Sequence, residues 1–155
     1  MSKVPAAILF VLLFSLAAAP AGAQAIETAY FAVDMPDSWE LMQQRETGGI
    51  TMAIFGTKAR DARVTTVVSA TFGIDVKTIA SSFALQYKAK RQPAISKGGQ
   101  ASFAYNTYEG GDGMAWLAVQ DDYYMFTTAE GDLRKARDFV RKLSSTKYPG
   151  LVPSL

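Results

Sequence analysis

The stretch MAWLAVQ, residues 114–120, limits the fold of this 155-residue chain more than any other. It has the composition of a strand, and the side chains of a strand alternate between the two faces of its sheet. Both alternating sets are apolar here: Met114, Trp116 and Ala118 form one, and Ala115, Leu117 and Val119 the other. A strand that is apolar on both sides is buried on both sides. We therefore expect a central strand in a sheet with both faces covered.

Six further runs have the composition of strands, bounded by turn residues. The first enters a Met-Pro-Asp-Ser turn and the chain resumes at Trp39. The links between the first four runs are of hairpin length, which predicts a meander of antiparallel strands. The six runs are 30–33, 39–45, 50–55, 64–72, 100–109 and 123–129, and we also consider a short strand at 94–96.

Two segments have helical periodicity. Asp75 can cap a helix with an apolar residue at every third or fourth position from Val76 to Tyr87. Lys88, Lys90 and Arg91 are placed where a helix dipole favours cations, and Pro93 prevents continuation. A second helix is expected from Gly131-Asp132 to about Ser144-Ser145. Its buried positions are Leu133, Ala136, Phe139, Val140 and Leu143.

The resulting order is β-β-β-β-α-β-β-β-α. Runs of strands with one helix inserted and one appended predict an α+β fold. We expect an antiparallel sheet of about six or seven strands flanked by helices, as an α/β/α sandwich. One domain would cover residues 24–145, and 146–155, with two prolines, would be an irregular tail.

The first 23 residues have the pattern of a secretory signal peptide. A short basic segment precedes the apolar run 6–19, and Ala21-Gly22-Ala23 is a small-x-small cleavage pattern. The run of 14 residues is short for a membrane span, which needs about 20. We expect cleavage near Ala23/Gln24 and a periplasmic or secreted product, with an uncleaved anchor as the alternative.

Composition excludes several classes of chemistry. The chain has no histidine and no cysteine, so Ser-His and Cys-His nucleophile pairs and zinc sites built from these residues are ruled out. The net charge is +2, and +1 without Lys3, which gives no electrostatic reason to expect nucleic acid. We expect no enzyme activity and no cofactor.

Four acidic residues near turns are better explained by turn chemistry than by a metal site. Glu109 and Asp112 precede the strand at 114–120, whereas Asp121 and Asp122 follow it. The two pairs are therefore at opposite ends of one strand. Aspartate is common in such turns, so no catalytic or metal-binding residue is predicted.

The closing helix carries the best candidates for partner binding. A solvated helix face is the simpler explanation, but two cations fall in the first turn, where the helix dipole disfavours them. This conflict suggests an acidic partner, or less favourably an anionic membrane surface. The candidate residues are Arg134, Lys135, Arg137, Arg141 and Lys142.

Aromatic residues concentrate in the two C-terminal hairpins. If one sheet face were incompletely covered, some of them could line a groove for a peptide or a small apolar ligand. The candidates are Tyr105, Trp116 and Tyr124. Core packing and cross-strand pairing are the alternative explanation.

The motif FAVDMPDSW at residues 31–39 resembles the entry pattern of the PsbP-like superfamily. That group includes an extrinsic photosystem II subunit, a Ran-binding import factor and exported bacterial relatives such as DcrB. The mid-chain helix, the Gly-turned hairpin leading into Tyr-Tyr and the closing helix after Gly-Asp add to the resemblance, which covers about residues 28–144. It implies an antiparallel sheet between helices, and members of the group act mostly as binding or assembly factors.

Our hypothesis is an exported, non-catalytic binding or assembly-factor domain of the bacterial cell envelope, acting through contact with another envelope protein. The alternative is a periplasmic carrier of a small ligand or peptide that uses an aromatic groove.

Overall fold

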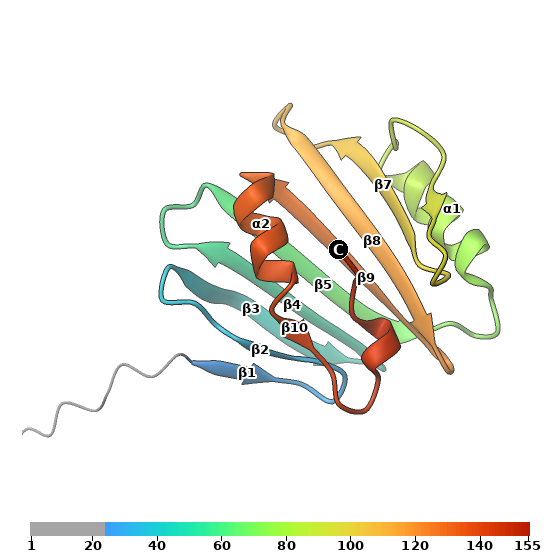
Figure 1. The fold of residues 1–155 in the computed structure, drawn as a ribbon, viewed down its shortest axis with the longest axis horizontal. Coiled ribbons are helices and arrows are strands. Elements are labelled where there is room, and N and C mark those ends of the chain that lie inside the picture. Colours follow the sequence, from blue (N-terminus) through green and yellow to red (C-terminus); the bar gives the residue numbers. More distant parts are fainter. Residues whose placement is uncertain (1–23) are drawn as a thin grey trace, which may run out of the picture.

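The computed structural model describes residues 24–155, so the signal peptide predicted at 1–23 lies outside the described residues. Its main element is a seven-stranded antiparallel sheet in the order β3-β4-β5-β9-β8-β7-β6, seen in Figure 1. With its two α-helices, this confirms the α+β class. The strands are β3 Trp39–Thr47, β4 Ile50–Thr57, β5 Ala62–Ala70, β6 Ala94–Ile95, β7 Ala101–Asn106, β8 Asp112–Gln120 and β9 Tyr123–Gly131.

The first predicted strand does not belong to the meander. Residues Ala32–Asp34 form β2, which pairs with β1 (Ala25–Glu27) and β10 (Leu143–Ser144) in a separate three-stranded sheet. Pro36 ends this pairing, and its carbonyl accepts a hydrogen bond from Trp39 N–H at 2.9 Å in the turn that leads into β3. The meander prediction was therefore wrong at its first strand, and the two strands of two or three residues that complete the small sheet were missed.

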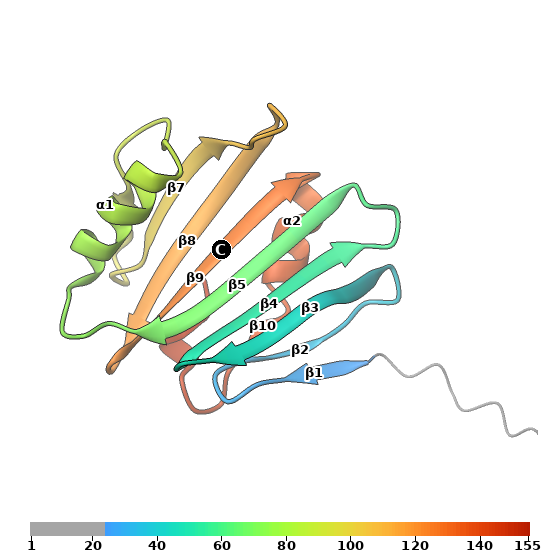
Figure 2. The ribbon, with the colours of Figure 1, turned by 180° about the vertical axis from the view of Figure 1, so that it is seen from behind.

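Strand β8 lies inside the sheet, between β7 and β9, and has cover on both faces, as predicted. Trp116 and the main core lie on one face, where α2 (Leu133–Val140) packs. Leu117 and a second core lie on the other face, under α1 (Val76–Gln86). Figure 1 shows α2 in front of the sheet, and the view from behind in Figure 2 shows α1 at the β7 end.

Helix α1 begins as predicted but ends earlier. The Asp75 side chain accepts a hydrogen bond from Thr78 N–H at 3.0 Å and caps the N-terminus. At the other end Lys88 adopts a left-handed backbone with φ +53°, and Ala89 N–H donates to the Ala84 carbonyl at 2.8 Å. This is a Schellman ending, so Lys90 and Arg91 follow the helix and do not lie in its last turn.

Helix α2 is also shorter than predicted. It ends at Val140, and the chain turns so that Leu143 pairs with Val33 of β2. Leu143 is buried as expected, but it lies on a strand and not on the helix. Periodicity could not show this, because the position of Leu143 fits the apolar stripe of a continuing helix.

The C-terminal segment, expected to be an irregular tail, packs into the main core. Residues Pro149–Leu151 form a 3-10 turn, η1, that contacts β8 and β9. Tyr148 and Leu151 are buried in the main core. Residues 146–155 therefore help to cover the same sheet face as α2.

The junction between β9 and α2 predicts a strict requirement for glycine. Gly131 has φ +79°, and a Cβ there would overlap the carbonyl oxygen of Asp61. We expect Gly131→Ala to lower the free energy of unfolding by about 3 kcal/mol or more, since it adds a backbone clash to the cost of a left-handed alanine. Urea unfolding followed by circular dichroism measures the loss.

Gly73 provides the matched control. It has a similar backbone angle, φ +76°, but a Cβ added to it would meet no atom within 4 Å. Gly73→Ala should cost only the conformational part, about 1–2 kcal/mol. Equal losses in the two variants would contradict the close packing of Gly131 against Asp61.

Candidate functional site

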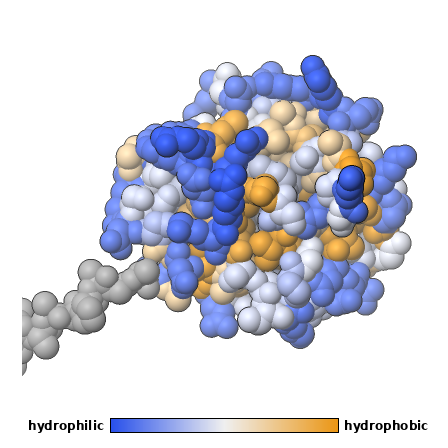
Figure 3. Space-filling view, in the orientation of Figure 1, coloured by the Kyte–Doolittle hydropathy of each residue, from blue (hydrophilic) through white to orange (hydrophobic). Residues whose placement is uncertain are grey.

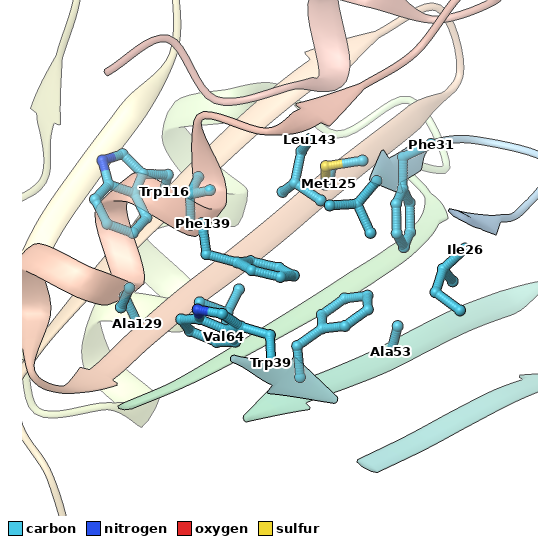
Figure 4. Packing of buried hydrophobic residues seen from close by; sticks show 14 of the residues in the cluster. Ile26, Phe31, Trp39, Ala53, Val64, Trp116, Met125, Ala129, Phe139 and Leu143 are labelled. Atoms are coloured by element: carbon cyan, nitrogen blue, oxygen red, sulfur yellow. The ribbon is translucent and has the colours of Figure 1, made fainter. Parts of the chain in front are cut away.

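The orientation of α2 is fixed by two aromatic contacts between Phe139 and the sheet. Phe139 stacks on Trp39 of β3 with ring centroids 4.2 Å apart and also packs on Phe55 of β4 at 4.9 Å. Figure 4 shows the Phe139 and Trp39 rings close together in the main core. Ala136 and Val140 are buried on the same side of the helix. Trp39 is thus a packing residue, and the opposite side of α2 is turned to solvent.

The N-terminus of α2 is held by the loop before β5. The Asp61 carbonyl accepts a hydrogen bond from Asp132 N–H at 2.7 Å, and the Asp61 carboxylate pairs with Lys135. The Asp132 side chain caps the helix by accepting from Arg134 N–H and Lys135 N–H, both at 3.1 Å. The hydrogen bonds from Lys135 and Thr57 lower the pKa of Asp61, and the bond to Asp61 raises the pKa of Lys135.

The five cations proposed as partner-binding residues are all on or just after α2, but they are not equivalent. Lys135 pairs with Asp61, and Arg141 Nη1 donates to Asp138 Oδ1 at 2.8 Å. The three that form no ion pair within residues 24–155 are Arg134, Arg137 and Lys142. Figure 3 shows hydrophilic residues gathered over α2 on the face seen in Figure 1.

A cavity of about 230 Å³ lies between α2, β7, β8 and the C-terminal segment. We call it the arginine pocket, since Arg137 and Arg141 both reach it. Trp116, buried in the sheet, forms part of its wall. No acidic side chain of the described residues lines it, and Leu155, whose α-carboxylate is the one anionic group in the lining, forms no ion pair with either arginine. The structure therefore brings together residues from two separate sequence predictions, the basic helix and the aromatic groove. Its principal lining residues are Ser96, Ser102, Trp116, Arg137, Arg141 and Ser154.

A second cavity, the lysine pocket, lies on the other side of α2 and has a volume of about 460 Å³. Three lysines, Lys58, Lys135 and Lys142, line it together with the carboxylates of Asp61 and Asp138. The two carboxylates offset two of its three positive charges. The arginine pocket is therefore the better site for an anion.

The three aromatic residues proposed for one groove do not come together. Strand parity places Tyr105 and Tyr124 on the α1 side of the sheet and Trp116 on the α2 side. Tyr105 is buried under α1, whereas Tyr124 lines a surface pocket beside that helix. Only Trp116 lies near the cations of α2.

Tyr105 belongs instead to a polar row across the sheet that sequence reasoning missed. Its ring lies over its cross-strand neighbour Gly113, where a Cβ would overlap it, and its hydroxyl donates to Glu130 Oε1 at 2.9 Å. Glu130 also pairs with Arg63 on β5. Burial and the nearby Glu130 carboxylate raise the pKa of Tyr105 far above 10, so the phenol stays protonated. In the sequence, the glycine at 113 was the one indication of this contact, because a glycine within a strand often marks a place where another group packs directly on the backbone.

The pocket beside α1 has a volume of about 340 Å³ and apolar walls, and we call it the phenylalanine pocket. Phe83 and Tyr124 form one side, in edge contact at 5.9 Å. Phe72, with 87% of its surface exposed and φ +52°, forms another. Ile74 and Ile79 add further apolar surface, and the polar residues of the lining are Ser69, Thr71, Thr78, Ser82 and Gln86.

The acidic residues of the hairpins stay apart, as the strand length predicted. Asp112 begins β8 and pairs with Lys90 at 2.6 Å, and Asp121 adopts a left-handed turn conformation at the far end. Among the described residues, no three carboxylates are close enough to share a metal ion.

No protein-family model matches this sequence, and no curated protein matches it significantly. No described helix has the length and apolar character needed to cross a membrane.

The Asp61–Lys135 contact predicts a pH dependence of stability. Because the folded-state pKa of Asp61 is lowered, its contribution is present above the ordinary value of 3.8 and is lost as the pH falls through the lower folded value. Asp61→Asn should therefore lower the Tm at pH 7, and its difference from the wild type should become smaller as the pH falls from 4 toward 2. Thermal unfolding at pH 7 and between pH 4 and pH 2 tests this.

Asp34→Asn is the control, since Asp34 is exposed on β2 and forms no ion pair within residues 24–155. It should change the Tm little at each of these pH values. A loss in Asp61→Asn that is equal at pH 7 and pH 2 would contradict a role for the carboxylate charge.

Proposed function

We propose that this chain is an exported, non-catalytic binding domain of the cell envelope that contacts an acidic segment of a partner protein through α2. The observation that carries the proposal is the arginine pocket, which the exposed Arg137 and Arg141 line together with the buried Trp116. Arginine and tryptophan are the residue types most enriched among the energetically dominant residues of protein interfaces.

The charge distribution on α2 supports this proposal. Arg134 is exposed in the first helical turn, where the macrodipole disfavours a cation, and it forms no ion pair within the described part of the chain. Arg137 is exposed one turn later and is equally unpaired. Cations arranged in this way raise the local positive potential, which steers acidic partners and speeds their association.

We further propose that the fold is of the PsbP-like type, as an α/β/α sandwich. The motif at residues 31–39 and helices packed against two different faces of an antiparallel sheet support this assignment. Binding and assembly roles are common in that superfamily, so the assignment agrees with the proposed function without specifying a partner.

Charge reversal on the exposed side of α2 tests the proposal. The mature chain, immobilised as bait, should retain a defined set of proteins from an envelope extract. The triple variant Arg134→Glu, Arg137→Glu and Arg141→Glu should lose the acidic members of that set by tenfold or more in quantitative mass spectrometry, because attraction becomes repulsion.

The control changes the net charge equally but elsewhere. Lys77, Lys88 and Lys97 are exposed and form no ion pair within residues 24–155. Replacing these three by glutamate should leave the retained set unchanged. If the α2 variant keeps every partner, or both variants lose the same ones, binding through α2 is wrong.

The phenylalanine pocket favours a second candidate function, a carrier of a small apolar ligand. Its volume of about 340 Å³ lies within the range of small-molecule sites, roughly 300–1,000 Å³. Phe72 and Ile74, which both line it, are 87% and 47% exposed, so they form adjoining exposed apolar surface at the pocket and not a single exposed side chain.

Binding of the apolar dye anilinonaphthalene sulfonate tests the carrier function. Dye fluorescence should rise with the wild-type protein and fall at least threefold with Phe72→Ser, which removes one wall of the pocket. Leu85→Ser is the control, because Leu85 is 82% exposed on α1 but lies outside this pocket. Equal effects of the two variants would show only nonspecific adsorption and would count against a carrier.

A further inference from the structure

We propose that the arginine pocket receives a single carboxylate side chain of the acidic partner, held by the guanidinium groups of Arg137 and Arg141 against the indole of Trp116. This inference rests on the proposed function and goes further, because it names the chemical group and the place where it binds.

The two arginines are placed to act on one ligand. They are four residues apart, so they lie on the same side of α2 one turn from each other. Both line the same cavity of about 230 Å³. A guanidinium presents paired N–H donors in a plane, which match the two oxygens of a carboxylate.

The charge of this pair is available to a ligand. Arg137 forms no ion pair with any of residues 24–155. Arg141 donates to Asp138, but both side chains are more than half exposed, and exposed pairs of this kind contribute little. A guanidinium also has five N–H donors, so Arg141 can keep Asp138 and still bind a second carboxylate.

The opposite wall is positioned by hydrogen bonds within the chain. Gln100 Nε2 donates to the Val152 carbonyl at 2.9 Å, and its Oε1 accepts from Ser154 N–H at 2.8 Å. The two ends of one amide thus attach the C-terminal segment beside β7. The hydroxyl-bearing residues Ser102 and Ser154 line the cavity from these two elements. This wall exists before any ligand binds, which reduces the ordering cost of binding.

Size and shape favour a protein side chain over other anionic ligands. A volume of about 230 Å³ is below the usual range of small-molecule sites, roughly 300–1,000 Å³, but accommodates one carboxylate side chain. A cavity between a helix and a sheet suits a projecting group rather than the flat surface of a membrane. The lysine pocket is larger, but its own two carboxylates oppose an incoming anion.

The test uses a fluorescein-labelled hexaglutamate peptide, with hexaglutamine as the uncharged probe, and fluorescence anisotropy at 150 mM salt. Two double variants remove the same charge from the same helix region. Arg137→Gln with Arg141→Gln empties the pocket of cations, whereas Arg134→Gln with Lys142→Gln removes exposed cations outside it.

We expect the wild-type chain to bind hexaglutamate and not hexaglutamine. The pocket variant should weaken binding at least tenfold, and the outside variant less than threefold. Both keep the buried side of α2, and circular dichroism checks that they are folded. Tryptophan emission should also change on binding, and Trp116→Phe should abolish that change while Trp39→Phe preserves it.

Three outcomes would overturn the pocket assignment. Equal losses in the two double variants would indicate a diffuse basic surface, which leaves the proposed function standing. Binding to vesicles of phosphatidylglycerol but not to hexaglutamate would indicate a membrane surface. No binding to hexaglutamate, together with an unchanged partner set for the charge-reversed α2 variant, would overturn both the pocket and the proposed function.

Discussion

The packing of Phe139 between α2 and the sheet is the interaction on which the rest of this surface depends. Helix α2 has only eight residues, too few to be stable alone in water. Its formation therefore relies on tertiary contacts, of which the Phe139 stack on Trp39 at 4.2 Å is the closest aromatic one. Burying a phenylalanine contributes about 1.5–3 kcal/mol, and a ring pair adds about 1 kcal/mol. With Phe139 fixed inward, Arg134 and Arg137 must point outward.

Charged groups on the two faces of the sheet have different surroundings. On the α1 side, Tyr105 of β7, Glu130 of β9 and Arg63 of β5 satisfy one another in a row that passes over Gly113 of β8, so the charges are used within the fold. On the α2 side, Arg137 has no such partner within residues 24–155. The carboxylate of Glu130 is thus used within the fold, whereas the guanidinium of Arg137 stays exposed to solvent.

Patterns within one segment predicted the α+β class and several single elements, but not how all the strands pair. The two apolar sets of residues 114–120 required a strand covered on both faces, and β8 is such a strand. Asp75 and the apolar stripe after it located the start of α1. The ends of the helices were less predictable: Leu143 fits a helical stripe, and only its pairing with Val33, more than a hundred residues away, makes it a strand residue.

The candidate site depends on contacts that sequence patterns do not contain. Trp116 was grouped with Tyr105 and Tyr124 because all are aromatic and close in the chain, but strand register places it on the opposite face. The arginine pocket also needs the C-terminal segment to fold back to Gln100, and that segment was expected to be irregular. The basic residues of α2 were identified from their positions in the predicted closing helix, whereas their separation into two pockets follows only from packing.

The most direct test of the account is to map where hexaglutamate binds, by following the amide and indole resonances of ¹⁵N-labelled protein spanning residues 24–155 in two-dimensional NMR spectra. The account predicts that the largest shifts fall on residues 137–142, on 100–102 and on the indole N–H of Trp116, with little change around the phenylalanine pocket at Phe72 and Phe83. Shifts spread evenly over the basic surface, or concentrated around Phe72, would contradict it.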